Sequence, residues 1–132
     1  MEINLFGGNV VDNLILKNGF FEECQNNPLV YKVEYNDNYL KIFTEIFIKR
    51  EDSYLNLYLI FEDEGVCLSD SNEIYRIYDG YYDISNEMLK GFAESLDLDY
   101  ENYRFTKYVT LDTLGFELQK FEKLKEMIEN LE

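Results

Sequence analysis

The sequence predicts an α+β fold: an antiparallel sheet meander of about four to five strands, with one helix before it and two helices packed on it from the C-terminal part. Three observations lead to this prediction. Alternating apolar and polar residues fill much of the first half of the chain. Apolar residues at helical spacing mark segments near both ends. The 132 residues match the usual size of one domain, so we expect a single domain over residues 1–132.

The first predicted helix covers residues 9–24. Apolar side chains recur at helical spacing there, from Val10 to Phe21. The pair Asn18-Gly19 predicts an early end to this helix, because Asn-Gly favours a turn.

The next part of the chain predicts a meander of strands. The expected strands cover residues 29–35, 39–49, 54–61 and 66–68, and turn-forming residues separate them. Short connections favour antiparallel pairing of consecutive strands. One face of this sheet would be aliphatic, and the other would carry four aromatic residues for helices or a partner to cover: Phe43, Phe47, Tyr54 and Tyr58.

The second half of the chain contains segments with the apolar spacing of helices and segments with the alternation of strands. Residues 72–82 predict either one helical turn or an edge strand. Ser85 then predicts the N-cap of a helix over residues 86–96, which has an apolar stripe. A strand is expected over residues 104–109, and Thr110 is expected to cap a terminal helix.

The charge balance limits the classes of partner. Twelve Lys and Arg stand against 27 Asp and Glu, which gives a formal net charge of −15. Such a chain repels phosphate backbones and anionic membranes, so we expect no direct contact with nucleic acid or membrane. The same field favours encounter with a basic surface on another protein. A plainer interpretation is that the acidity only keeps an aromatic-rich protein soluble.

The residue inventory argues against catalysis and cofactors. The chain has no histidine and only two cysteines, Cys24 and Cys67, so imidazole-dependent nucleophiles and a cysteine-based zinc site are not expected. The stretch from Asp97 to Glu101 begins like a calcium loop, but Asn102 stands where that loop needs glycine. We therefore expect no enzyme, no metal and no cofactor. Two free thiols, with no signal peptide or membrane span, predict a bacterial cytoplasm.

A cluster of tyrosines and acidic residues is the predicted partner-binding surface. Tyrosine offers a large contact area at low entropic cost, and carboxylates beside it would meet Lys and Arg of a partner. The alternative is that the tyrosines close the core. The candidate residues are Glu62, Asp63, Glu64, Tyr75, Tyr78, Asp79, Tyr81, Tyr82 and Asp83.

Residues 54–131 resemble a family of short bacterial and phage-borne domains of unknown function. In that family a strand ends in Leu-Ser-Asp-Asp-Gly, and a short segment, a helix, a strand and a terminal helix follow. Leu68-Ser69-Asp70 matches this strand end, whereas Ser71-Asn72 replaces the Asp-Gly. By size and acidity the chain also resembles phage-encoded inhibitors of bacterial immunity, which include anti-CRISPR proteins and DNA mimics.

These observations predict a protein-binding inhibitor from a phage or mobile element, directed at the basic surface of a nucleic-acid-handling immune protein. One alternative is an accessory or antitoxin-like subunit of a bacterial defence system. Another is a carboxylate-based enzyme or a small-ligand binder, which would need a deep pocket with convergent acidic groups of raised pKa.

Overall fold

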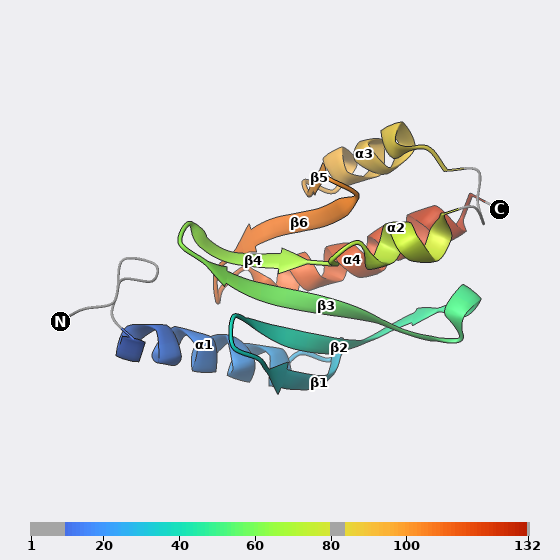
Figure 1. Cartoon of the computed structure of the whole chain (residues 1–132). Helices are drawn as coiled ribbons and strands as arrows, with labels where there is room; N and C mark the ends of the chain where they lie inside the picture. Colours follow the sequence, from blue (N-terminus) through green and yellow to red (C-terminus); the bar gives the residue numbers. More distant parts are fainter. Residues whose placement is uncertain (1–9, 80–83, 132) are drawn as a thin grey trace.

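The computed structural model describes residues 10–79 and 84–131 (Figure 1). They contain a six-stranded sheet in the order β1-β2-β3-β4-β6-β5, and every neighbouring pair is antiparallel. The fold is therefore α+β, as the sequence predicts, with slightly more strands than expected. The strands are β1 (Val30–Tyr35), β2 (Tyr39–Ile48), β3 (Ser53–Glu62), β4 (Gly65–Ser69), β5 (Asp99–Glu101) and β6 (Arg104–Val109).

The unexpected strand is β5, in a stretch whose sequence reads as a connection. It pairs only with β6, from Asp99 opposite Thr106 to Glu101 opposite Arg104. Asn102 and Tyr103 form the turn between the two strands, both with positive φ, near 55° and 65°. Two consecutive left-handed residues are what a two-residue hairpin turn requires. The prediction missed β5 because three residues, two of them carboxylates, are too few to show a strand pattern.

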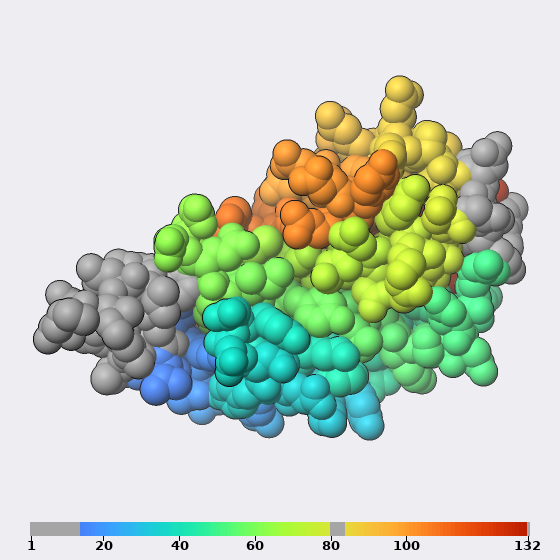
Figure 2. Space-filling model, in the orientation of Figure 1, coloured from blue at the N-terminus to red at the C-terminus, as the bar shows by residue number. Residues whose placement is uncertain are grey.

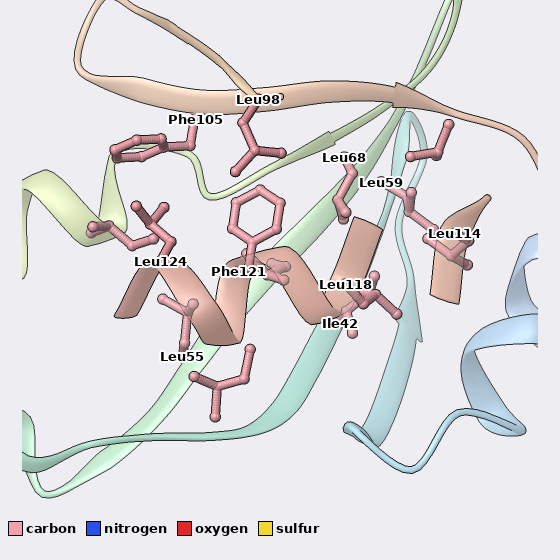
Figure 3. Close-up of a cluster of buried hydrophobic side chains, with 14 of the residues drawn as sticks. Ile42, Leu55, Leu59, Leu68, Leu98, Phe105, Leu114, Leu118, Phe121 and Leu124 are labelled. Carbon is pink, nitrogen blue, oxygen red and sulfur yellow. The ribbon is translucent and has the colours of Figure 1, made fainter. Parts of the chain in front are cut away.

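Two long helices cover one face of the sheet. They are α1 (Val10–Gln25) and α4 (Leu114–Glu129), and α4 runs behind the strands in Figure 1. Figure 3 shows Leu118 and Phe121 of α4 against Ile42, Leu59 and Leu68 of the sheet, all of them fully buried. Burial of each such side chain contributes about 1.5–3 kcal/mol, so this layer contact holds the fold together.

Helix α1 does not end at Asn18-Gly19, so that prediction was wrong. The helix continues because Phe20 and Cys24, which lie beyond the pair, are fully buried. The Phe20 ring meets Phe61 of β3 edge-on, with centroids 5.9 Å apart. This burial outweighs the cost of a glycine in a helix, about 1 kcal/mol. A Cβ on Gly19 would lie 3.3 Å from Leu111 Cδ1, so the glycine also permits a close approach there.

Helix α2 (Glu73–Tyr78) resolves the alternatives for residues 72–82 in favour of a helical turn over its described part. It follows β4 directly. Residues 53–57 of β3 have no partner in β4, and α2 lies beside this part of β3. Arg50 Nε donates a hydrogen bond to the Ile77 carbonyl at 3.2 Å, which ties α2 to the turn before β3. The helix therefore fills the space into which β4 would otherwise extend.

Of the two predicted helix caps, one is confirmed and the other was wrong. Helix α3 (Asn86–Ser95) is capped as expected, because Ser85 Oγ accepts a hydrogen bond from the Met88 N–H at 3.2 Å. The cap predicted at Thr110 was wrong: α4 begins at Leu114, and Thr113 is its N-cap residue. Residues 110–113 instead form a turn in which the Thr110 N–H donates to Thr113 Oγ1 at 2.8 Å.

Candidate protein-binding surface

The face of the sheet opposite α1 and α4 is left without a helical layer in the described part of the chain. We call it the open face (Figure 1). One row across it consists of Tyr39, Ile60, Cys67 and Tyr108, which are paired strand to strand. A second row consists of Lys41, Tyr58, Ser69, Thr106 and Asp99. Figure 2 shows this face in space-filling form, with β3 in green and β6 in orange.

Aromatic rings form one half of the open face. Tyr39 and Tyr58 meet edge-on with ring centroids 5.8 Å apart, and Phe47 and Tyr54 do the same at 5.5 Å. Phe47 and Tyr54 are exposed. Phe47, Tyr54 and Tyr58 belong to the aromatic set that the sequence placed on the second face. Tyr54 also lines a small hollow with Glu73, Arg76 and Ile77 of α2, so α2 lies beside this end of the face. Paired rings offer a partner large, rigid contact area at low entropic cost.

Two lysines flank the ring of Phe43 in the same half. Lys32 Nζ lies 5.2 Å and Lys41 Nζ 4.8 Å from its centroid. Cation–π contacts of this kind contribute about 0.5–1 kcal/mol at exposed sites. They hold the ring over the sheet, so this end of the open face is neither acidic nor purely apolar.

The other half of the open face is hollowed. The hollow has a volume of about 610 Å³, which falls in the range of small-molecule and peptide sites. Its floor comes from β3, β4 and β6, and α3 forms one wall. Floor residues are Ile60, Cys67, Ser69, Thr106 and Tyr108, and charged residues around it are Glu62, Lys90, Glu94, Asp99, Glu101 and Arg104.

Carboxylates outnumber cations around the hollow, four to two. Tyr108 Oη donates a hydrogen bond to Glu62 Oε1 at 2.7 Å, and this bond raises the pKa of Tyr108 to about 12. The phenol therefore stays a neutral donor. Burial raises the pKa of the Cys67 thiol to about 11, so the thiol in the floor stays protonated and is not a nucleophile at neutral pH. The hollow is suited to attract a cation and offers no activated nucleophile.

The predicted acidic residues Glu62, Asp63 and Glu64 lie at the β3–β4 turn. Glu62 lines the hollow, while Asp63 and Glu64 are exposed at the tip. Gly65 closes the turn with a φ of +145°, a conformation that side-chain-bearing residues rarely adopt. The tip therefore extends the acidic rim of the hollow beyond the sheet.

The predicted tyrosine cluster lies elsewhere, on α2. Tyr75 is half-buried, and its ring lies 4.6 Å from that of Tyr103. Tyr78 is only 2% exposed, and its hydroxyl donates to Glu129 Oε2 of α4 at 3.0 Å. Tyr78 therefore belongs to the core, which is the alternative that the sequence left open. Asp79 is exposed after α2, and Tyr81, Tyr82 and Asp83 lie outside the described residues.

The two predicted clusters do not form one patch. The tip precedes β4 and α2 follows it, so the length of β4 separates them. The sequence prediction joined them because both are acidic. The predicted surface did not include Lys90 and Glu94 of α3, nor the residues of the β5–β6 hairpin that line the hollow: Asp99, Tyr100, Glu101, Arg104, Thr106 and Tyr108. The strand expected over residues 104–109 is present as β6, but the sequence does not tell that β6 pairs with β4, and this pairing brings Arg104, Thr106 and Tyr108 to the hollow.

Asp70 is buried behind the open face and does not line the hollow. It is 0% exposed, and its carboxylate accepts backbone N–H bonds from Phe105 (2.9 Å), Ile74 (3.0 Å) and Asn72 (3.3 Å). Burial raises the pKa of Asp70 to about 6, although these donors act in the opposite direction. Leu68-Ser69-Asp70, the tripeptide behind the family resemblance, thus supplies a core residue, a floor residue and the tie between β4, α2 and β6.

The comparisons with protein-family models, curated proteins and solved structures find no match to this chain. Within the described ranges, none of the helices combines the length and apolarity that a membrane span requires. Across the same residues, no three His, Cys, Asp or Glu side chains gather in a way that could hold a metal ion.

Proposed function

We propose that this protein is a protein-binding inhibitor that acts through its open face, and that its target is the basic surface of a nucleic-acid-handling bacterial immune protein. The observation that carries the proposal is the uncovered sheet face, with paired aromatic rings on one side and an acid-rimmed hollow on the other. A phage or mobile element is the proposed source, on the resemblance in size and acidity.

The aromatic half supplies the apolar contacts, from which water would be excluded on binding. Energetically dominant interface residues are usually large rings near the centre of a buried patch. Phe47 and Tyr54 have the exposure and mutual support for this role, since each already rests on the other. Association would bury them against the partner without first ordering a flexible side chain, which lowers the entropic cost of binding.

The hollow and the tip supply the charge. Glu62 of β3 and Asp99 and Glu101 of β5 stand around one concavity, so they present separate negative charges to a single partner surface. Lys and Arg that normally meet phosphates would meet these carboxylates instead. The binding would block a nucleic-acid channel by occupancy, with no bond made or broken.

The enzyme alternative lacks the feature that would favour it. Asp70, whose pKa is raised, is enclosed by β4, α2 and β6 and does not line the hollow. A carboxylate enzyme would need such a group beside the substrate space.

The test is a capture experiment with two matched baits. Glu62→Lys/Asp99→Lys/Glu101→Lys reverses three charges of the hollow, and Glu23→Lys/Asp112→Lys/Glu126→Lys reverses three exposed charges that do not line it. Each triple variant raises the net charge by six units from −15, so the two variants differ only in where the reversed charges lie. Circular dichroism and thermal melting check that both variants fold.

Both baits and the wild type are presented to lysates of bacteria that carry defence loci, across a salt series and with competing nucleic acid. We expect the wild type and the control triple to retain a basic nucleic-acid-binding protein that salt or nucleic acid releases, and the hollow triple to lose it. Equal retention by both triples would contradict the proposal. A salt-resistant partner indifferent to nucleic acid would instead favour the accessory-subunit alternative.

A further inference from the structure

Strand β1 forms one margin of the sheet, and within the described residues no strand pairs with its outer side (Figure 1). The Asn36 N–H donates to the Tyr39 carbonyl at 3.0 Å and closes the β1–β2 hairpin. In an antiparallel ladder, residues alternate between those bonded to the neighbouring strand and those whose backbone groups point away. Lys32 and Glu34 are thus bonded to β2, and Val33 and Tyr35 direct their N–H and C=O groups outward.

The sequence of β1 is nearly symmetric about Val33. Tyr31-Lys32-Val33-Glu34-Tyr35 has tyrosine at both ends and opposite charges on either side of the centre. An antiparallel pairing with a second copy, with a two-fold axis at Val33, places each Lys32 opposite the other copy's Glu34. It also places each Tyr31 opposite the other copy's Tyr35. This self-complementarity is what a two-fold symmetric interface requires.

The side chains are already disposed for this pairing. Lys32 Nζ lies 3.2 Å from Glu34 Oε2 within one chain, and both side chains are exposed. Two copies would turn this pair into a ring of four alternating charges. Tyr31 is 71% and Tyr35 48% exposed. Tyr35 is held in place by stacking on Phe21, with centroids 4.6 Å apart, and by donating to Asn18 Oδ1.

The charge of this margin favours a second copy over a basic partner. The five residues carry one positive and one negative charge, so they are neutral in a chain of net charge −15. A partner selected by acidity would find little attraction here, whereas another β1 strand places Glu34 opposite Lys32 and Lys32 opposite Glu34. A register shift between Val30 and Lys32 limits the regular edge, so the ladder is short.

We infer that the protein self-associates into a two-fold dimer by antiparallel pairing of β1 strands about Val33, which extends the sheet across two copies. The interface is separate from the open-face hollow. This inference does not rest on the proposed inhibitor function, and either could fail while the other holds.

Charge reversal at two positions tests the inference. Lys32→Glu and Glu34→Lys each set like charges opposite one another twice, and we expect each to weaken the dimer about tenfold or more. The double variant Lys32→Glu/Glu34→Lys restores opposite pairs and should dimerise like the wild type. The two single variants change the net charge in opposite directions, so an effect of overall repulsion would strengthen one and weaken the other.

Sedimentation equilibrium at physiological salt measures the association, since long-range repulsion is then screened beyond about 8 Å. Hydrogen exchange adds a local readout: the Val33 and Tyr35 amides should become protected as the protein concentration rises. A wild type that stays monomeric up to about millimolar concentration would overturn the inference. So would a dimer that both single variants leave intact, or one without protection at Val33. The hollow triple variant should dimerise normally.

Discussion

At Asp70, one carboxylate in the interior accepts N–H bonds from β6, α2 and the turn before α2. Its pKa is about 6 in the folded chain and near 3.8 when exposed. Between about pH 4 and 6 the folded state therefore holds a proton that the unfolded state has released. The contribution of Asp70 to the free energy of unfolding therefore falls as pH rises through that window, by roughly 3 kcal/mol in all.

We expect Asp70→Asn to remove this dependence. Wild type and variant are unfolded with urea at several pH values from 4 to 7, and the wild type should lose stability relative to the variant as pH rises. Asp112→Asn, at an exposed position, controls for the general effect of removing a negative charge. Parallel curves for wild type and Asp70→Asn would show that the carboxyl does not titrate in this window.

Tyr78 and Tyr75 lie in the same helix but differ in burial, so the loss of each side chain should change stability by a different amount. Tyr78→Ala should reduce the free energy of unfolding by roughly 3–5 kcal/mol, because it empties a fully buried aromatic site. Tyr75→Ala should cost only about 1 kcal/mol, mainly through the lost contact with the Tyr103 ring. Chemical denaturation measures both. Similar losses would mean that the two tyrosines are equally part of the core.

At the scale of elements, α4 carries an ion pair on its buried side. Lys120 Nζ lies 2.9 Å from Glu117 Oε1, and both side chains are almost inaccessible. Lys120→Met should destabilise the protein by about 3 kcal/mol, because it leaves a buried carboxylate unpaired. The double variant Glu117→Leu/Lys120→Met should be as stable as the wild type or more so. Urea unfolding of both variants checks this, and equal losses would contradict it.

The helices and strands were predicted from the sequence in part. The meander, the apolar stripe of α3 with its Ser85 cap, and the presence of a terminal helix follow from local sequence, because side-chain spacing and capping residues determine them. The early end of α1 at Gly19 and the cap at Thr110 were wrong. The continuation of α1 depends on the tertiary packing of Phe20 against β3, which local propensity does not contain. At Thr110 the N–H bonds to Thr113 Oγ1 in a turn, and α4 begins only after that turn.

The candidate surface was predicted only in part. The rings of Phe43, Phe47, Tyr54 and Tyr58 follow from strand alternation. The hollow could not be predicted, because it needs the pairing of β4 with β6 and the position of α3 against β5. The β4–β6 pairing joins segments about 40 residues apart, and the packing of α3 on β5 follows from the turn that reverses the chain between them, so no local periodicity encodes either contact. Tyr78 was placed on the surface because its burial depends on α4, about 50 residues further along.

For the whole molecule, the net charge of −15 opposes compactness. Unfolding separates the charges, so screening them should favour the folded state. We expect the melting temperature to rise when sodium chloride is increased from about 20 mM to 500 mM, where the Debye length falls to a few ångströms. Differential scanning fluorimetry measures it. A constant or falling melting temperature would mean that the ion pairs of the fold outweigh the general repulsion.

The position of α4 in the chain has a consequence for biosynthesis. The ribosome makes β2, β3 and β4 well before α4, yet the aliphatic side of these strands packs mainly on Leu118 and Phe121. The nascent chain thus carries the meander with only α1 on its apolar side, and the part that α4 covers stays exposed until α4 has emerged. A ribosome-bound chain stalled before residue 114 should be captured by the chaperones that receive nascent proteins, and one stalled after α4 has emerged should not. Crosslinking of stalled chains would compare the two.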